Sequence, residues 1–215
     1  MIKKGDKILM RQLFANVALA GLFMVASFGT YAADCEDAKA QVKKTTDQVL
    51  NALKADASQV YALVDNVVLP SFDFKKMSRQ VVPRACWNEG SKREKRSKQK
   101  RFVKAFRDLL VRTYSSALKG AAGTVQSIGY SCSNEGTMGR RNTPLGKVKT
   151  TVSRQGESQA IEVDYAVYYK KRGNKWKVYN VYAAGMSLVN TYEAEFKGYC
   201  NNGGMDNLIN KVKNQ

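Results

Sequence analysis

The hydrophobic pattern changes its period at about Gly120, and this change limits the possible fold more than any other feature of the chain. Before Gly120, apolar residues recur every three or four positions, as they do on one face of an α-helix. After it, β-branched and aromatic residues alternate with polar ones in four runs: 123–132, 146–153, 158–171 and 175–184. Such alternation is typical of strands in an antiparallel sheet.

The order of these segments predicts the fold class. Helices are expected over 35–55, 56–72 (ending at Pro70), 72–87 (with its apolar stripe before Pro83), 92–118, 186–200 and 205–212. Gly173 and Asn174 suit a hairpin turn between the last two strands, because both residue types tolerate positive φ. We expect an α+β fold, with N-terminal helices packed on a curved antiparallel sheet of about four strands and C-terminal helices after it.

The first 32 residues resemble a cleavable signal peptide. Basic residues precede a short apolar run from Leu13 to Phe28, and Thr30 and Ala32 suit a cleavage site after residue 32. The alternative is an uncleaved anchor, although the run is short for a membrane span. Cleavage would leave residues 33–215, a single domain of 183 residues with a net charge of +15, exported to the periplasm.

The reactive side chains argue against an enzyme. Four cysteines remain after cleavage, which in an oxidising compartment predicts two disulfides with three possible pairings: Cys35, Cys86, Cys132 and Cys200. None of them lies close enough to another in sequence for a zinc motif, so no metal site is expected. The chain has no histidine, which removes the commonest general base. Glu162 and Asp164 are the strand carboxylates that acid–base chemistry in an apolar cavity could use.

A basic run, SKREKRSKQKRF, opens the longest expected helix and includes seven Lys or Arg residues. A segment that binds nucleic acid usually has aromatic residues among its basic ones, because nucleobases stack on aromatic rings. Residues 91–101 contain no aromatic residue. In an exported protein the run fits anionic membrane surfaces better, because each basic group near such a surface contributes about 1 kcal/mol. We therefore expect no nucleic-acid partner. A basic protein that binds the cell envelope remains an alternative function.

Several long motifs resemble those of the MlaC family, also called the toluene-tolerance family. The chain carries FDFKKMSRQVV followed by CW, RFVKAFRDLLVRTYSSAL, WKVYNVYAAGMSLVNTYEAEF and GGMDNLINKV, in the order and spacing of that family across nearly all of residues 33–215. Three positions depart from the family pattern: Asn180 replaces an aspartate, Ala184 replaces a glutamate, and Glu193 replaces a basic residue. Four cysteines are not a general feature of the family either.

The resemblance implies a periplasmic carrier that shuttles phospholipid between an outer-membrane lipoprotein complex and an inner-membrane ABC transporter, and so maintains outer-membrane lipid asymmetry. It implies no cofactor, with phospholipid as the bound ligand, and it requires no catalytic residue. The apolar stripes could be core or pocket lining, since both have the same composition. The predicted lipid-binding residues are Phe74, Met77, Phe102, Phe106, Leu109, Leu110, Val163, Tyr165, Val167, Trp176, Val178, Met186 and Val189.

Overall fold

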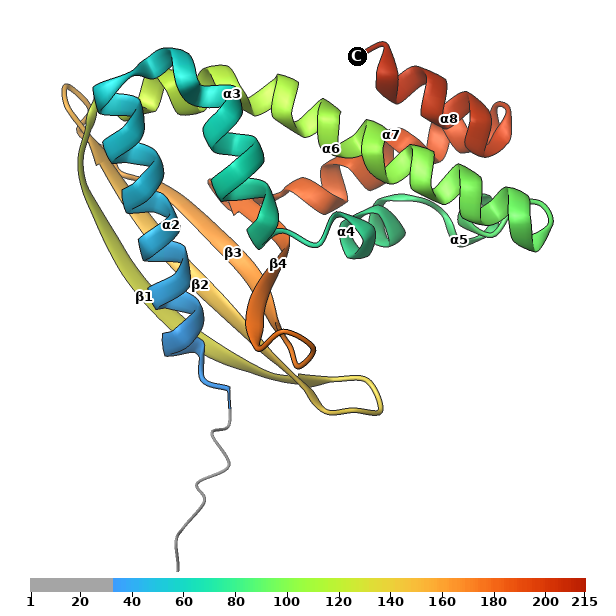
Figure 1. Cartoon of the computed structure of the whole chain (residues 1–215), viewed down its shortest axis with the longest axis horizontal. Helices are drawn as coiled ribbons and strands as arrows, with labels where there is room; N and C mark the ends of the chain where they lie inside the picture. Colours follow the sequence, from blue (N-terminus) through green and yellow to red (C-terminus); the bar gives the residue numbers. More distant parts are fainter. Residues whose placement is uncertain (1–32) are drawn as a thin grey trace, which may run out of the picture. The chain divides into compact units, whose positions relative to one another are not determined.

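The computed structural model describes residues 33–215 and has the expected order of helices, strands and helices (Figure 1). The predicted signal peptide lies outside the described residues. The elements are α2 (Cys35–Ala55), α3 (Val60–Leu63), α4 (Phe74–Val81), α5 (Arg84–Trp87), α6 (Lys92–Ala122), β1 (Val125–Met138), β2 (Thr143–Arg154), β3 (Ile161–Lys170), β4 (Lys175–Ala183), β5 (Met186–Ser187), α7 (Leu188–Asn201) and α8 (Gly204–Lys213). No helix of the described residues is long and apolar enough to cross a membrane.

The strands form one antiparallel sheet in the order β1-β2-β3-β4-β5, which confirms the α+β prediction and adds the two-residue strand β5. One register row joins Tyr130, Thr150, Val163 and Ala183 across the four long strands. The pairing of β3 with β4 shifts at Ala166 and Val167, so Tyr179 is an extra residue in β4. Such a bulge bends the strand and increases its twist.

Three segments differ from the sequence prediction. The helix expected over 72–87 is divided into α4 and α5 at Pro83, and residues 186–187, expected to begin a helix, form β5. The third segment is the one over 56–72. The pattern over 56–72 predicts a single helix, whereas the structure divides it into a 3₁₀ turn (Ala57–Gln59), α3, a π turn (Val64–Val68) and another 3₁₀ turn (Leu69–Ser71). Pro70 cannot donate a hydrogen bond to the preceding turn, and the wide π turn lies just before it. Val60 and Val64 are nevertheless buried against α2, as the apolar stripe predicts.

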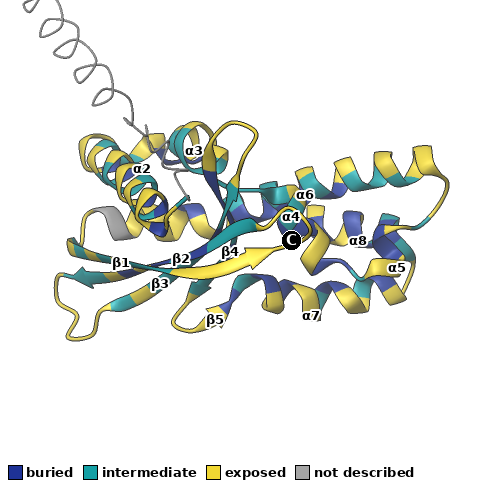
Figure 2. Ribbon diagram, turned by 90° about the horizontal axis from the view of Figure 1, so that it is seen from below, coloured by how far each residue is buried: buried dark blue, intermediate teal, exposed yellow. Residues whose placement is uncertain are grey.

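The apolar residues gather in three clusters rather than in one core. Figure 2 shows buried residues both on the helices and along the sheet. The helical core joins α4, α5, α6, α7 and α8, and Phe102, Phe106 and Phe196 at its centre are completely buried. The sheet core lies between α2 and the sheet, around Val148 and Val167. The third cluster joins α2 to the α3 region around Leu53 and Val64.

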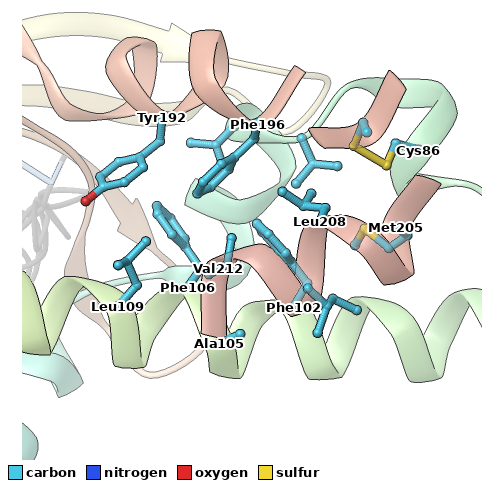
Figure 3. Packing of buried hydrophobic residues seen from close by; sticks show 14 of the residues in the cluster. Cys86, Phe102, Ala105, Phe106, Leu109, Tyr192, Phe196, Met205, Leu208 and Val212 are labelled. Carbon is cyan, nitrogen blue, oxygen red and sulfur yellow. A yellow bond between two sulfur atoms is a disulfide. The ribbon is translucent and has the colours of Figure 1, made fainter. Parts of the chain in front are cut away.

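Aromatic rings fix the geometry of the helical core (Figure 3). The Phe102 and Phe106 rings of α6 stack at a centroid distance of 5.8 Å, and the Phe196 ring of α7 meets both edge-on at 5.7 Å. Tyr192 adds another edge contact with Phe106 at 5.3 Å. Each such pair contributes about 0.5–1.5 kcal/mol beyond area burial, so α6 and α7 are held in a defined relation.

All four cysteines are paired, as expected, and the structure resolves the pairing. Cys35 at the start of α2 is bonded to Cys132 in β1, and Cys86 in α5 is bonded to Cys200 near the end of α7. Gly146 lies beside the first disulfide, where a Cβ would meet Val167 Cγ2 at 3.3 Å and the Cβ of Cys35 at 3.4 Å. One disulfide therefore attaches α2 to the sheet, and the other closes the helical core.

Replacing both Cys86 and Cys200 with alanine should lower the free energy of unfolding by about 2–4 kcal/mol, because this disulfide closes a loop of 114 residues in the unfolded chain. Urea denaturation of the oxidised wild type and the double variant measures this. The Cys35/Cys132 double variant, which opens a loop of 97 residues, should lose a similar amount. Unchanged stability in both variants would show that neither disulfide forms.

Candidate functional site

The structure separates the predicted lipid-binding residues into two groups. Seven of them lie in or against the helical core: Phe74, Met77, Phe102, Phe106, Leu109, Leu110 and Val189. Four lie in or against the sheet core: Tyr165, Val167, Trp176 and Val178. Val163 is partly buried in β3 beside neither cluster. Any ligand that touched most of these residues would have to lie between the two cores.

Met186 is the predicted residue that the structure does not bring inside. It is 70% exposed, because it belongs to β5, where it alternates with the buried Ser187. Sequence pattern assigned it to the start of a helix, where it would share a face with Val189. The short strand instead turns its side chain away from the core.

Phe72, which the sequence analysis did not select, joins the two cores. Its side chain is partly buried and packs against both the helical core and the sheet core. Its ring stacks on that of Phe74 at a centroid distance of 5.8 Å. The backbone continues beside the edge of the sheet, where Phe72 pairs with Val178 and the Asp73 N–H donates to the Val178 carbonyl at 2.8 Å. Phe72 and Phe74 thus define a seam between the helices and the sheet.

Three buried polar atoms have no hydrogen-bond partner among the described residues: Ser78 Oγ, Tyr130 Oη and Trp176 Nε1. Such groups are rare in folded proteins, since an unpaired buried donor costs about 1–3 kcal/mol. Trp176 is 3% exposed and packs in the sheet core, so its indole N–H is a donor within an apolar environment. An ester or phosphate oxygen is an acceptor that this N–H could use.

A polar cluster surrounds the first turn of α4, next to the seam. The Asp73 carboxylate caps the helix by accepting from the Lys76 N–H at 2.9 Å, and it also accepts a hydrogen bond from the Tyr168 hydroxyl. Burial acts to raise the pKa of Asp73, but these two hydrogen bonds together with the charges of Lys170 and Lys177 outweigh it, and the pKa is lowered. Burial and the bond to the carboxylate raise the pKa of Tyr168, so its hydroxyl remains a donor.

The basic run of α6 is only partly neutralised by acidic neighbours. Lys98 bridges Glu89 at 2.5 Å and Asp206 at 2.9 Å, and Arg101 pairs with Asp206. Glu89 also accepts from the Met205 N–H at 2.7 Å, so this network ties α6 to the start of α8. The described residues offer no ion pair to the remaining basic side chains of the run, which are Lys92, Arg93, Lys95, Arg96 and Lys100.

Four of the five unpaired basic residues share one exposed face: Lys92, Arg93, Arg96 and Lys100. Lys95 is only partly exposed and lies about two helical turns before Phe102, on the side of the buried rings. Arg93, Arg96 and Lys100 follow one another at spacings of three and four residues, which places them on one side of a helix. Lys92 and Ser97 line an open hollow together with them. A second hollow lies beside the end of β4, between Arg154 and Ala184, and both polar and apolar residues line it.

The carboxylates considered for catalysis do not face the interior. Glu162 is exposed, and Asp164 is partly exposed on the side of β3 opposite Val163. The grouping of Cys35, Glu36 and Cys132 has the spacing of metal ligands, but its two sulfur atoms form a disulfide. The described interior therefore combines large apolar surfaces with isolated donors, which suits binding of an apolar ligand with a polar end.

Comparison with known proteins identifies relatives of the chain. The family model of the MlaC protein matches residues 40–214. A search of curated proteins gives no match. Among solved structures, the chain is similar to the phospholipid-binding protein from Ralstonia solanacearum, determined in complex with a phospholipid, with a TM-score of 0.64 and 27% sequence identity. The similarity covers 83% of this chain and 96% of that chain.

Proposed function

Because this chain belongs to the MlaC family, we propose that it binds phospholipid and carries it through the periplasm. The family match over nearly all described residues is the observation that carries the proposal, and the phospholipid in the related Ralstonia solanacearum structure supports the ligand class. The same match favours a binding and transport protein over an enzyme. The outward placement of Glu162 and Asp164 agrees with that preference.

The acyl chains are proposed to lie along the seam at Phe72 and Phe74, between the helical core and the sheet core. Residues of both cores would then line the ligand, which explains why the predicted lining divides into two groups. The cores are closely packed in this structure, so lipid entry would require them to separate at the seam. The lone Trp176 N–H lies in the sheet core, where it could meet an ester oxygen.

The energetics explain the need for a carrier. Transfer of one methylene from water to an apolar environment is worth about 0.8 kcal/mol. Two acyl chains contain on the order of 30 methylenes, so exposing them to water costs up to roughly 24 kcal/mol. A protein that encloses the chains removes most of this barrier without any chemical step.

The route of the lipid is a further part of the proposal. By its family resemblance, the protein would exchange lipid with an outer-membrane lipoprotein complex and an inner-membrane ABC transporter, and so maintain outer-membrane lipid asymmetry. The unpaired basic face of α6 would meet anionic membrane surfaces during these encounters. That face is directed away from the Phe102–Phe106 side of the helix, so membrane contact and lipid binding would use separate surfaces.

Protein purified without detergent should contain phospholipid. Organic extraction and mass spectrometry should recover about one phospholipid per protein, because the apolar ligand has no favourable alternative in water. The apoprotein, prepared by delipidation and refolding, should regain lipid when mixed with vesicles. A folded protein that neither contains phospholipid nor acquires it from vesicles would refute the proposed function.

Neutralising the basic face should weaken membrane binding and leave lipid binding intact. With Lys92, Arg93, Arg96 and Lys100 all changed to glutamine, affinity for vesicles containing anionic lipid should fall more than tenfold at low salt, since each basic group contributes about 1 kcal/mol. Vesicle co-sedimentation measures this affinity.

A matched variant tests whether position matters as well as charge. It carries four glutamines at exposed basic sites outside α6: Lys44, Lys54, Lys171 and Arg172. Its vesicle affinity should fall much less. Equal losses in the two variants would mean that net charge, rather than this face, governs membrane binding, and loss of bound phospholipid in the α6 variant would contradict the separation of surfaces.

A further inference from the structure

Lys76 in α4 is a partly buried cation without a carboxylate partner. Its ammonium lies 4.2 Å from the centroid of the Tyr168 ring and 4.4 Å from that of Tyr179. Its hydrogen-bond contact is the weak acceptor Met138 Sδ, at 2.8 Å. None of the ion pairs formed by the described residues includes Lys76.

Asp73 cannot fully compensate this charge. One of its oxygens accepts from the Lys76 backbone N–H and the other accepts from Tyr168, whereas the Lys76 ammonium contacts Met138 instead of either oxygen. Burial lowers the pKa of Lys76 although the Asp73 charge opposes the shift. The ammonium is therefore less well stabilised than one in water.

Lys177 is a second cation that lies within electrostatic range of Asp73. It is the register partner of Tyr168, so both side chains lie on the same face of the sheet. Lys177 is only 8% exposed and donates to the Pro70 carbonyl. Its pKa is lowered by burial and by the nearby charges of Lys175 and Lys170. Lys76, Lys170 and Lys177 thus lie within electrostatic range of the Asp73 carboxylate, and the Glu135 carboxylate lies within range of Tyr179.

We propose that Lys76 and Lys177 form a binding site for a phosphate group, in which Lys76 contacts the phosphate directly and Lys177 supplies a second positive charge. Partly desolvated cations that lack a charged partner are costly, and a bound anion removes that cost. A phosphate oxygen accepts charge-assisted hydrogen bonds from ammonium groups, which are the stronger class of hydrogen bond.

The position of the site indicates which phosphate it takes. Asp73 lies between Phe72, which contacts both cores, and Phe74, which stacks on it, and Lys76 follows two residues after Phe74. A phosphodiester at Lys76 would therefore leave its acyl chains beside the seam. This inference rests on the proposed function for the identity of the ligand, although free phosphate has the same chemistry and is tested separately.

The test compares a phospholipid with diacylglycerol, which has the same acyl chains and no phosphate. Binding is measured by transfer of fluorescent analogues of phosphatidylglycerol and diacylglycerol from vesicles to the purified protein. In Lys76→Met, affinity for phosphatidylglycerol should fall about 10- to 100-fold, as loss of a hydrogen bond to a charged group implies. Affinity for diacylglycerol should remain unchanged.

Two further variants control for charge and folding. Lys75→Met removes an exposed lysine from the neighbouring position of α4 and should leave the preference for phosphatidylglycerol intact. Lys177→Met should reduce that preference, and it serves as the second test if Lys76→Met does not fold. The methionine side chain can replace the apolar stem of either lysine.

The outcomes separate this inference from the proposed function. Wild type that takes up neither lipid overturns both. A second outcome is that wild type binds both lipids and that neither Lys76→Met nor Lys177→Met reduces its preference for phosphatidylglycerol. This result overturns the phosphate site but not the proposed carrier function. Inorganic phosphate is tested by its effect on the melting temperature at constant ionic strength. If it stabilises wild type but not Lys76→Met while the lipid preference is unaffected, the site takes free phosphate and the headgroup assignment is wrong.

Discussion

Phe72 contacts both apolar cores, and this contact joins the helices to the sheet. The helical core and the sheet core are separate clusters, and the chain passes from one to the other beside the edge of β4. Two disulfides stabilise the elements on either side of this passage, one in each core. A protein with this arrangement could open at Phe72 while each core keeps its own packing, which is the property that a carrier of a large apolar ligand requires.

The fold class could be predicted from the hydrophobic period, because each type of spacing extends over many residues. The spacing is helical before Gly120, alternating from there to the end of β4, and helical again after β4. Gly173 also indicates the turn between β3 and β4 correctly, whereas Pro70 lies within the 3₁₀ turn Leu69–Ser71 and not at the end of a helix. Local irregularities were less predictable. The π turn before Pro70 and the extra residue Tyr179 in β4 depend on tertiary packing, and the two-residue β5 is too short to show a period.

The candidate site could be predicted only in part, because the hydrophobic period shows which residues face inward but not which residues they contact. Apolar stripes identify residues that face inward, so the burial of Phe102, Phe106 and Val167 could be predicted. The hydrophobic period does not show which of the two cores a residue joins. Phe72 and Lys76 were missed because their importance comes from neighbours distant in sequence, such as Val178 and Tyr168. The cysteine count predicted two disulfides, whereas their pairing required the three-dimensional structure.

Photocrosslinking tests whether phospholipid lies along the seam at Phe72. A phospholipid with a diazirine group in its acyl chain is loaded into the wild-type protein and activated, and the modified peptides are identified by mass spectrometry. Labelling is expected on the segment around Phe72 and Phe74 together with the β4 segment around Trp176 and Val178. Labelling confined to the basic face of α6 or to the exposed face of β3 around Glu162 would contradict binding at the seam.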